Sequence, residues 1–415
     1  MIVVFVHQNF PGQYKHLARH FATQPGSRVL FVTQSASGEI PSVEKIVYDP
    51  GAPQTLSCHP YTVEFDRSIR AGLAVAEVLR RMKTEGLRPD VICGHNGWGE
   101  MLFVKDVFPD VPVLSYFEFY YHALGVDVGF DPEFSGDAID PLRLRTRNAV
   151  NLLGFDAADW GNTPTQWQRS VHPPELRSRL TVIHEGVDTE AICPDPTAWL
   201  HLQRDGVVLN RQSEIVTYVA RNLEPYRGFH VFMRAAARVL KRRPQARVVV
   251  VGGDEISYGL PLPDGGSYRE LMIRELGADL DIGRVHFLGR VPFDTFLKLL
   301  QVSSAHVYLT YPFVLSWSFI EALSVGCAIV GSATPPVQEV VRHGENGLLV
   351  DFFSVAAVAD AIEELLDRRD LAAELGEAAR RTAMARYDLH SRQLPLWDAL
   401  IGDLVAGRRP ALLPG

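Results

Sequence analysis

The chain has 415 residues, of which 47% are hydrophobic and 22% are charged, and its formal net charge is −8. This length and composition are typical of a globular protein with two or three domains. The negative charge makes nucleic acid an unexpected partner, and no apolar run approaches the ~20 residues of a membrane span. Four scattered cysteines without metal or redox spacing favour a reduced, cytoplasmic location. Contact with the inner face of a membrane stays open.

The N-terminal half alternates strand-like and helix-like segments. It opens on the apolar run 2–6, which lacks the basic region and cleavage site of a signal peptide and is predicted as the first strand. The alternation predicts a doubly wound parallel sheet, an α/β class of fold. Strands are predicted at 2–6, 28–33, 90–93, 111–117, 159–162 and 180–184, and helices at about 13–22 and 66–85.

A second alternating region follows a break in this pattern. The Pro- and Asp-rich sequence at 193–196 begins a helix-poor segment to about Ser213, which is predicted as a linker. Beyond the linker, ligands are expected at the carboxyl ends of the strands, as in other open parallel sheets. Strands are predicted at 215–220, 246–252, 285–288, 305–309 and 327–330, and helices at 228–241, 268–276, 292–302, 337–342, 355–367 and 371–385.

The stretch 311–351 is the most informative part of the chain. A loop there runs into a helix, and the N–H groups at a helix N-terminus form a ready site for a phosphate. Glu321 lies within that helix, where a carboxylate can accept hydrogen bonds from sugar hydroxyls. The alternative is a carboxylate that only stabilises the helix dipole. Ser316 stands at the expected N-cap, so its hydroxyl can serve either the cap or a ligand.

Two arginines, Arg221 and Arg227, follow the strand predicted at 215–220, in the sequence RNLEPYRG. A pair of guanidinium groups near a strand end can hold a diphosphate by bidentate hydrogen bonds, and a surface pair is the alternative. Two fixed cations can also stabilise the charge on a leaving diphosphate, as a magnesium ion does elsewhere. We therefore expect no metal and no other cofactor.

Two glycines mark tight turns next to predicted strands. Gly12 follows Pro11 before the first helix, and Gly253 belongs to the Gly-Gly pair at the end of the strand 246–252. Glycine lets the backbone approach a ligand closely and can leave a helix N-terminus open. A plain turn is the alternative at both positions.

Together these segments resemble the retaining glycosyltransferases of the GT-B fold, family 4. NTPT at 162–165 and IHEGVD at 183–188 are similar to the segments that close the family's first domain. The resemblance implies two doubly wound Rossmann-like domains facing a central cleft, an acceptor-side domain at 1–195 and a nucleotide-sugar domain at 196–387. It also implies that the tail at about 388–415 returns to the first domain.

The resemblance assigns roles to particular residues. It places the backbone N–H groups of Ser316 and Trp317 on the donor phosphate and Glu321 on the ribose of the nucleotide. It places the main chain of Arg290 and Val291 on the base. Arg221 matches the family's arginine, and Gly12 stands in a turn that resembles the family's first loop. Gly253 is expected beside the donor because of its tight turn at the strand end.

Three positions depart from the family's pattern. Arg227 replaces a lysine, Phe313 replaces the first glutamate of an E-x7-E pair, and Glu118 replaces a histidine that contacts the donor sugar. Phe313 cannot hydrogen-bond a hydroxyl, so one interpretation is that the carboxylate has moved from this position to Glu118. The alternative is that Glu118 pairs with an arginine. His95, after the strand 90–93, is a candidate for binding the acceptor or the sugar, or a structural histidine.

The resemblance implies a retaining, metal-independent glycosyltransferase. It would move a sugar from a nucleoside-diphosphate sugar to a hydroxyl acceptor (a glycan, a lipid-linked sugar or a small molecule), and the leaving diphosphate would take the proton. The lack of GxGxxG after the first strand and of a P-loop motif argues against a dehydrogenase or a P-loop ATPase. The alternatives are an epimerase or a phosphorylase on the same fold, or a non-catalytic protein that binds a sugar nucleotide.

Overall fold

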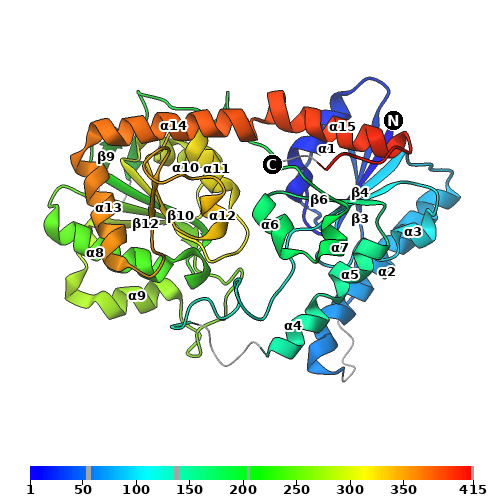
Figure 1. Ribbon diagram of the computed structural model, residues 1–415, viewed down its shortest axis with the longest axis horizontal. Helices are drawn as coiled ribbons and strands as arrows, with labels where there is room; N and C mark the ends of the chain where they lie inside the picture. The colour runs from blue at the N-terminus through cyan, green and yellow to red at the C-terminus, as the bar shows by residue number, and fades with distance from the viewer. Residues whose placement is uncertain (53–57, 135–139, 203–205, 413–415) are drawn as a thin grey trace. The chain divides into compact units, whose positions relative to one another are not determined.

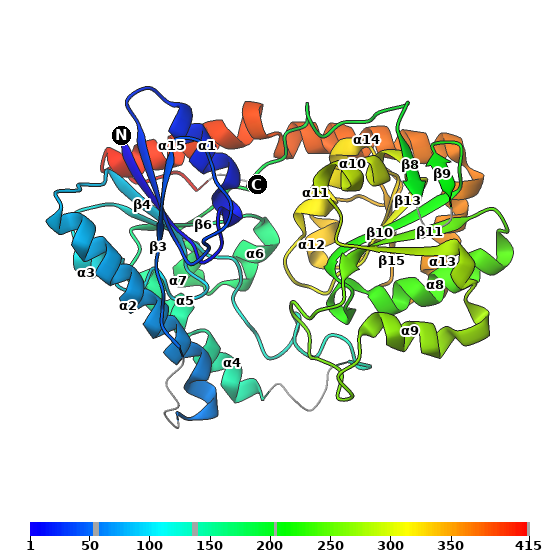
Figure 2. The ribbon, with the colours of Figure 1, turned by 180° about the vertical axis from the view of Figure 1, so that it is seen from behind.

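The protein consists of two compact α/β units (Figures 1 and 2). The computed structural model describes residues 1–52, 58–134, 140–202 and 206–412. Unit 1 comprises Met1–Val128, Asp137–Gly186 and Leu389–Gly415, and unit 2 comprises Gly129–Gly136 and Val187–Asp388. The chain therefore passes between the units more than once.

The centre of unit 1 is a sheet of parallel strands. Its described strands follow the order β3-β2-β1-β4-β5-β6-β7. The inner strand β1 pairs with β2 and β4, so that Val3 lies beside both Val29 and Val91. Apolar runs such as this one fit a parallel sheet, whose strands are buried on both faces. The strands are β1 (Ile2–Val6), β2 (Arg28–Thr33), β3 (Val43–Val47), β4 (Val91–His95), β5 (Val113–Tyr116), β6 (Trp160–Thr163) and β7 (Leu180–Val182).

Helices cover both faces of this sheet. Successive residues of a strand point to opposite faces, and Phe5 packs with Leu17 of α1 and Trp397 of α15, whereas Val4 packs with Leu79 of α2. The C-terminal helix α15 is thus part of the unit 1 core (Figures 1 and 2). The helices are α1 (Lys15–Thr23), α2 (Val63–Thr84), α3 (Val104–Val107), α4 (Pro141–Arg147), α5 (Ala149–Asp156), α6 (Gln166–Val171), α7 (Pro174–Arg177) and α15 (Leu394–Val405).

Unit 2 repeats the design with a second parallel sheet of strand order β12-β11-β10-β13-β14-β15. Ile215 and Val219 of β10 pack into a core with α10, α11 and α14, while α8 and α13 lie on the opposite face (Figure 1). The strands are β10 (Ile215–Asn222), β11 (Arg247–Gly253), β12 (Val285–Gly289), β13 (Ala305–Tyr308), β14 (Ile329–Ser332) and β15 (Leu348–Val350). The helices are α8 (Phe229–Arg242), α9 (Tyr268–Leu276), α10 (Phe293–Val302), α11 (Trp317–Val325), α12 (Pro335–Gln338), α13 (Val355–Asp367) and α14 (Arg369–Tyr387).

The α/β class with two Rossmann-like sheets is confirmed, but several elements differ from the prediction. The expected linker contains an antiparallel hairpin, β8 (Trp199–Leu202) and β9 (Val207–Asn210), whose Leu200, Leu202 and Leu209 are buried in the unit 2 core. The helix predicted at 337–342 is only the short α12, which begins at Pro335. The sequence analysis also missed β3 and the short helices α3 to α7.

Residues 129–134 belong to unit 2, although they were expected in the first domain. Asp131 is 2% exposed; its carboxylate lies 3.0 Å from His230 Nε2 and accepts a hydrogen bond of 2.8 Å from the Tyr311 hydroxyl. Burial raises the pKa of Asp131, but the bonds from His230 and Tyr311 outweigh burial, and the pKa is lowered. Phe130 adds an aromatic contact, with its ring centre 5.0 Å from that of Tyr311.

We predict that Asp131→Ala destabilises unit 2 much more than Glu133→Ala. The first variant leaves two buried donors, on His230 and Tyr311, without their acceptor, at about 1–3 kcal/mol each. Glu133 forms an ion pair with Arg234 at 2.5 Å, but its side chain is 43% exposed, so its loss should cost about 1 kcal/mol or less. Urea unfolding of both variants measures the difference. Equal losses of unfolding free energy would contradict a structural role for the buried carboxylate.

Candidate functional site

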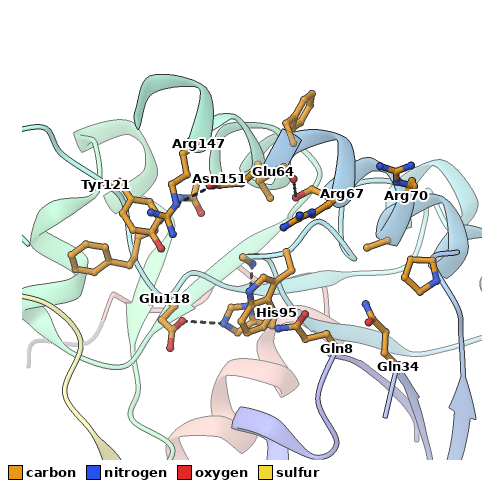
Figure 3. Close-up of a pocket in the computed structure, with 18 of the residues that line it drawn as sticks. Gln8, Gln34, Glu64, Arg67, Arg70, His95, Glu118, Tyr121, Arg147 and Asn151 are labelled. Atoms are coloured by element: carbon orange, nitrogen blue, oxygen red, sulfur yellow. Dashed lines mark hydrogen bonds and ion pairs between the residues drawn. The ribbon is translucent and has the colours of Figure 1, made fainter. Parts of the chain in front are cut away.

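A cavity of about 530 Å³ opens in unit 1 beside the ends of β4 and β5, with α2 and α5 as its walls (Figure 3). This volume is in the range of sites for small molecules. Its lining is mostly polar or charged and brings together the predicted residues His95 and Glu118. Other lining residues include Gln8, Gln34, Glu64, Arg67, Arg70, Trp98, Tyr121, Arg147 and Asn151.

His95 is the last residue of β4, and its side chain is 1% exposed. Its Nδ1 accepts a hydrogen bond of 3.0 Å from the Gly97 N–H, and its ring stacks on Trp98 with 4.1 Å between the ring centres. These contacts leave Nε2 directed toward Glu118 Oε2, 3.7 Å away (Figure 3). The histidine is therefore both buried in the structure and part of the cavity wall.

Glu118 lies two residues beyond β5 and is 35% exposed. Its Oε1 accepts a hydrogen bond of 3.3 Å from the Gln13 amide. In the part of the chain that the structure describes, no arginine pairs with Glu118, so the sequence-based alternative of an arginine partner is not supported. A carboxylate with this exposure can accept hydrogen bonds from hydroxyl groups of a ligand.

Gly12 supports Glu118 indirectly, through His7 and Gln13. His7 Nδ1 accepts from the Asn9 N–H at 2.8 Å, and Nε2 lies 2.6 Å from Gln13 Oε1. Burial, with a smaller effect of His95, lowers the pKa of His7 to about 3, so its ring is neutral at neutral pH. Gly12 has φ +52°, and a Cβ added there would lie 2.5 Å from the His7 ring. Close packing over His7 is therefore the visible reason for glycine.

The second candidate region is the carboxyl edge of the unit 2 sheet. Arg221 is exposed near the end of β10, Gly253 ends β11, and Arg290 follows β12. The Arg290 side chain bonds Glu255 at 2.6 Å and Asn222 Oδ1 at 3.3 Å. A Cβ on Gly253 would lie 2.4 Å from the Glu255 carboxylate, so glycine keeps this cluster compact.

Val291, the residue after Arg290, differs from this polar cluster because its side chain is apolar. Its side chain is partly buried and packs against the unit 2 core. Because the side chain packs on the core, only the main chain of Val291 is available for the predicted contact with a nucleotide base.

Arg227 is buried, in contrast to the exposed Arg221. Its guanidinium donates from one nitrogen to the Tyr308 hydroxyl at 3.1 Å, to Thr310 Oγ1 at 2.8 Å and to the Val314 carbonyl at 2.8 Å. The two arginines were predicted as one clamp, but the structure gives them different surroundings. Arg227 braces the loop between β13 and α11, and only Arg221 projects into solvent.

The hydroxyl of Ser316, at the start of α11, is not engaged in a hydrogen bond within the described residues. Ser316 does not cap the helix with its side chain, and its buried hydroxyl has no hydrogen-bond partner within the described residues. Its backbone N–H, predicted to meet a phosphate, donates to the Tyr308 hydroxyl at 2.9 Å. Trp317 is 45% exposed, and Glu321 is partly buried one turn along the helix.

Phe313 is part of an aromatic cluster and is 6% exposed. Its ring packs on Tyr258 and Tyr226, with ring centres 5.1 and 5.5 Å apart. Where the family's pattern has a glutamate that can hydrogen-bond, this chain has a phenylalanine that packs on two aromatic rings. The two tyrosines were not singled out in the sequence.

Glu224 was also missed, although it lies inside RNLEPYRG. It is fully buried, and its Oε2 accepts hydrogen bonds of 3.3, 3.0 and 2.9 Å from the N–H groups of residues 257–259. Burial raises its pKa. The carboxylate fixes the loop after β11 against the loop that carries Arg227. In the sequence, its position between Arg221 and Arg227 was the feature that could have identified it as a site residue.

The described residues contain no group of three or more His, Cys, Asp or Glu that could hold a metal ion. Among these residues, no helix combines the length and apolarity that crossing a membrane requires.

We predict that Gly12→Ala is more destabilising than Gly26→Ala. Both glycines have positive φ, +52° and +76°, but a Cβ on Gly26 would meet nothing within 4 Å. The control variant therefore carries only the backbone strain, about 1–2 kcal/mol. Gly12→Ala adds overpacking against His7, about 1–3 kcal/mol more. Denaturant unfolding of both variants gives the comparison, and equal free energies would show that the His7 contact is unimportant.

Both halves of the chain match models of protein families. A model described as glycosyl transferase family 4 group matches residues 25–192, and one described as glycosyl transferases group 1 matches residues 202–382. Among similar curated proteins is a GDP-mannose-dependent alpha-(1-6)-phosphatidylinositol monomannoside mannosyltransferase of Mycobacterium tuberculosis. It is 30% identical over 240 residues, which cover 54% of this chain and 56% of that protein.

A D-inositol 3-phosphate glycosyltransferase of Corynebacterium urealyticum is 28% identical over 215 residues, covering 51% of this chain and 48% of that protein. The chain thus spans about half the length of the curated relatives that it matches. Sucrose-phosphate synthase of Thermosynechococcus elongatus has a similar structure, with a TM-score of 0.73, 19% identity and coverage of 98% of this chain and 100% of that one.

Anabaena HepE in complex with UDP-glucose has a TM-score of 0.68 and 18% identity, with the same coverage of the two chains. At these identities the structural matches show the fold. The family models, the sequence relatives and the fold agree: this chain belongs to the family 4 glycosyltransferases, the glycosyl transferases group 1, and has the GT-B class of fold.

Proposed function

We propose that the protein is a retaining, metal-independent glycosyltransferase, which transfers a sugar from a nucleoside-diphosphate sugar to a hydroxyl acceptor. The observation that carries the proposal is the buried Ser316 hydroxyl at the N-terminus of α11, which has no hydrogen-bond partner among the described residues. It lies next to the Tyr308 hydroxyl, which contacts both the Ser316 N–H and the Arg227 guanidinium. A helix N-terminus, a buried cation and a hydroxyl with no partner among the described residues are together suited to a phosphate.

On the donor side, the diphosphate binds at the carboxyl edge of the unit 2 sheet. The Ser316 hydroxyl and the Trp317 N–H hydrogen-bond its oxygens, and Arg221 neutralises its charge. Arg227 adds positive potential from beneath and fixes the loop, a role for which its buried hydrogen bonds suit it. Glu321 holds the ribose, and the main chain beside Gly253 and at Arg290 and Val291 contacts the base.

On the acceptor side, hydroxyl groups bind in the unit 1 cavity at Glu118 and His95. The carboxylate can accept a hydrogen bond from a sugar hydroxyl, which Phe313 of unit 2 cannot do. Bond breaking leaves negative charge on the diphosphate, where fixed cations stabilise it. The diphosphate then accepts the proton of the attacking hydroxyl on the same face of the sugar, so the configuration is retained.

The names of similar proteins support a nucleotide-sugar donor. The mycobacterial relative is described as GDP-mannose-dependent, and the Anabaena structure holds UDP-glucose. They differ in base and sugar, so a panel of nucleotides is the direct way to identify the donor of this chain.

We expect one of UDP, GDP, ADP and TDP to raise the melting temperature of the protein with EDTA present. A ligand at 100 times its Kd stabilises the folded state by about 2.7 kcal/mol. The matching sugar nucleotide should then be consumed only when an acceptor is added. If none of the four shifts the melting temperature, the donor site is wrongly assigned. Consumption without an acceptor would indicate an epimerase, a need for orthophosphate would indicate a phosphorylase, and binding without turnover would indicate a non-catalytic protein.

Arg221→Ala should weaken binding of that nucleoside diphosphate at least about 10-fold, because hydrogen bonds to charged groups contribute about 1.5–3 kcal/mol. The exposed side chain predicts little change in stability. Arg211→Ala is the matched control, since Arg211 is also exposed but precedes β10 at the opposite end of the strand. Ser316→Ala should weaken binding less than Arg221→Ala, because it removes only one hydrogen bond from a neutral hydroxyl. Calorimetric titration of the three variants tests these roles, and unchanged affinity for Arg221→Ala would remove it from the site.

A further inference from the structure

The unit 1 cavity has a cationic side that the proposed hydroxyl contacts do not use. Arg67 and Arg70 project from α2, and Arg147 from the end of α4 (Figure 3). The protein as a whole carries a net charge of −8, so a local concentration of arginines does not follow from its composition. Arginines that converge on a cavity of this size are a common device for binding anions.

The carboxylates on this side do not balance the arginines. Asp66 pairs with Arg70, and Glu64 is shared between Arg143 at 2.7 Å and Arg147 at 3.3 Å. Arg67 has neither an ion pair nor a hydrogen bond from its side chain among the described residues. The three lining arginines and Arg143, which is outside the cavity lining, thus share two carboxylates, and this group of side chains has two positive charges in excess.

Arg147 is oriented for a ligand. Its guanidinium carbon lies over the Tyr121 ring, 3.8 Å from the ring centre, and its Nε is 3.3 Å from Glu64 Oε2 (Figure 3). The ring contact and the ion pair hold the group in place, while its two terminal nitrogens keep the fork geometry that suits phosphate oxygens. These two contacts restrict the side chain before a ligand arrives.

The opposite side of the cavity has different chemistry. Glu118 and His95 lie there, together with the Gln8 amide (Figure 3). A carboxylate repels an anion and accepts hydrogen bonds from hydroxyls. The two sides therefore favour a ligand with a negatively charged end and a hydroxyl-bearing end, in one orientation.

We propose that this cavity binds an acceptor that carries a phosphate group. The phosphate lies between Arg67 and Arg147, and the hydroxyl-bearing end faces Glu118. A phosphate has a charge of about −1.5 to −2 at neutral pH, which matches the excess of two cations better than a single carboxylate does. The term acceptor rests on the proposed glycosyltransferase function, whereas the anion site itself does not depend on it.

The test is calorimetric titration of the full chain with glucose 6-phosphate, glucuronate and glucose. Each titration is made with and without a saturating nucleoside diphosphate, which occupies the phosphate site of unit 2. Glucose 6-phosphate should bind at least about 10-fold more tightly than the other two, since charge-assisted hydrogen bonds to phosphate are the strong ones. Its affinity should fall as the salt concentration rises.

Arg67→Ala should weaken glucose 6-phosphate binding at least about 10-fold. Arg80→Ala, an exposed arginine on the same helix α2 but outside the cavity, is the control and should change nothing. Arg221→Ala, in unit 2, should also leave this binding intact. Equal binding of glucuronate, no binding of glucose 6-phosphate under either condition, or an affinity that ignores Arg67 would each overturn the proposal.

The two proposals fail separately. Arg67-dependent binding of glucose 6-phosphate in a protein that binds no nucleotide would retain the anion site and reject the donor site. Nucleotide binding without Arg67-dependent phosphate binding would do the reverse.

Discussion

Parallel pairing is the constraint on which both candidate sites depend. In a parallel sheet every strand ends at the same edge, so residues just beyond the strands are brought together from distant parts of the sequence. The inner strands are mostly apolar and buried on both faces, which leaves polar chemistry mainly to their ends. His95 and Glu118 meet in this way in unit 1, and Asn222, Gly253 and Arg290 do so in unit 2.

The buried guanidinium of Arg227 shows how such an edge is stabilised. Burying a charge is unfavourable unless hydrogen bonds compensate it, and here a hydroxyl, a second hydroxyl and a carbonyl do so. The Tyr308 hydroxyl that accepts from Arg227 also accepts from the Ser316 N–H, so the cation and the start of α11 are fixed together.

The sequence predicted those parts of the fold that leave a local pattern. The runs of valine and isoleucine in β1, β10 and β11 and the long helices α2 and α8 are recognisable from composition and periodicity. The candidate donor loops followed because they stand directly after those strands. His95 and Glu118 were found for the same reason, and their meeting in one cavity follows from the pairing of β4 with β5.

Features that depend on distant contacts could not be predicted. The 129–134 segment joins unit 2 through the pair Asp131–His230, whose partners are about a hundred residues apart and share no motif. The hairpin β8–β9 is short, and its burial depends on the unit 2 core that covers it. Arg67 and Arg147 stand on separate helices, so only the folded chain shows that they line one cavity.

The polarity of the unit 1 cavity follows from a chain of hydrogen bonds that begins beneath it. Because His7 Nδ1 accepts from the Asn9 N–H and the ring is neutral, its single proton is on Nε2 and is donated to Gln13 Oε1. The Gln13 amide must then present its NH₂ to Glu118, as observed. Glu118 is therefore held as an acceptor by a neutral donor, and its negative charge is not cancelled. That uncancelled charge opposes the cationic side at Arg67 and Arg147, and it gives the cavity two chemically distinct ends.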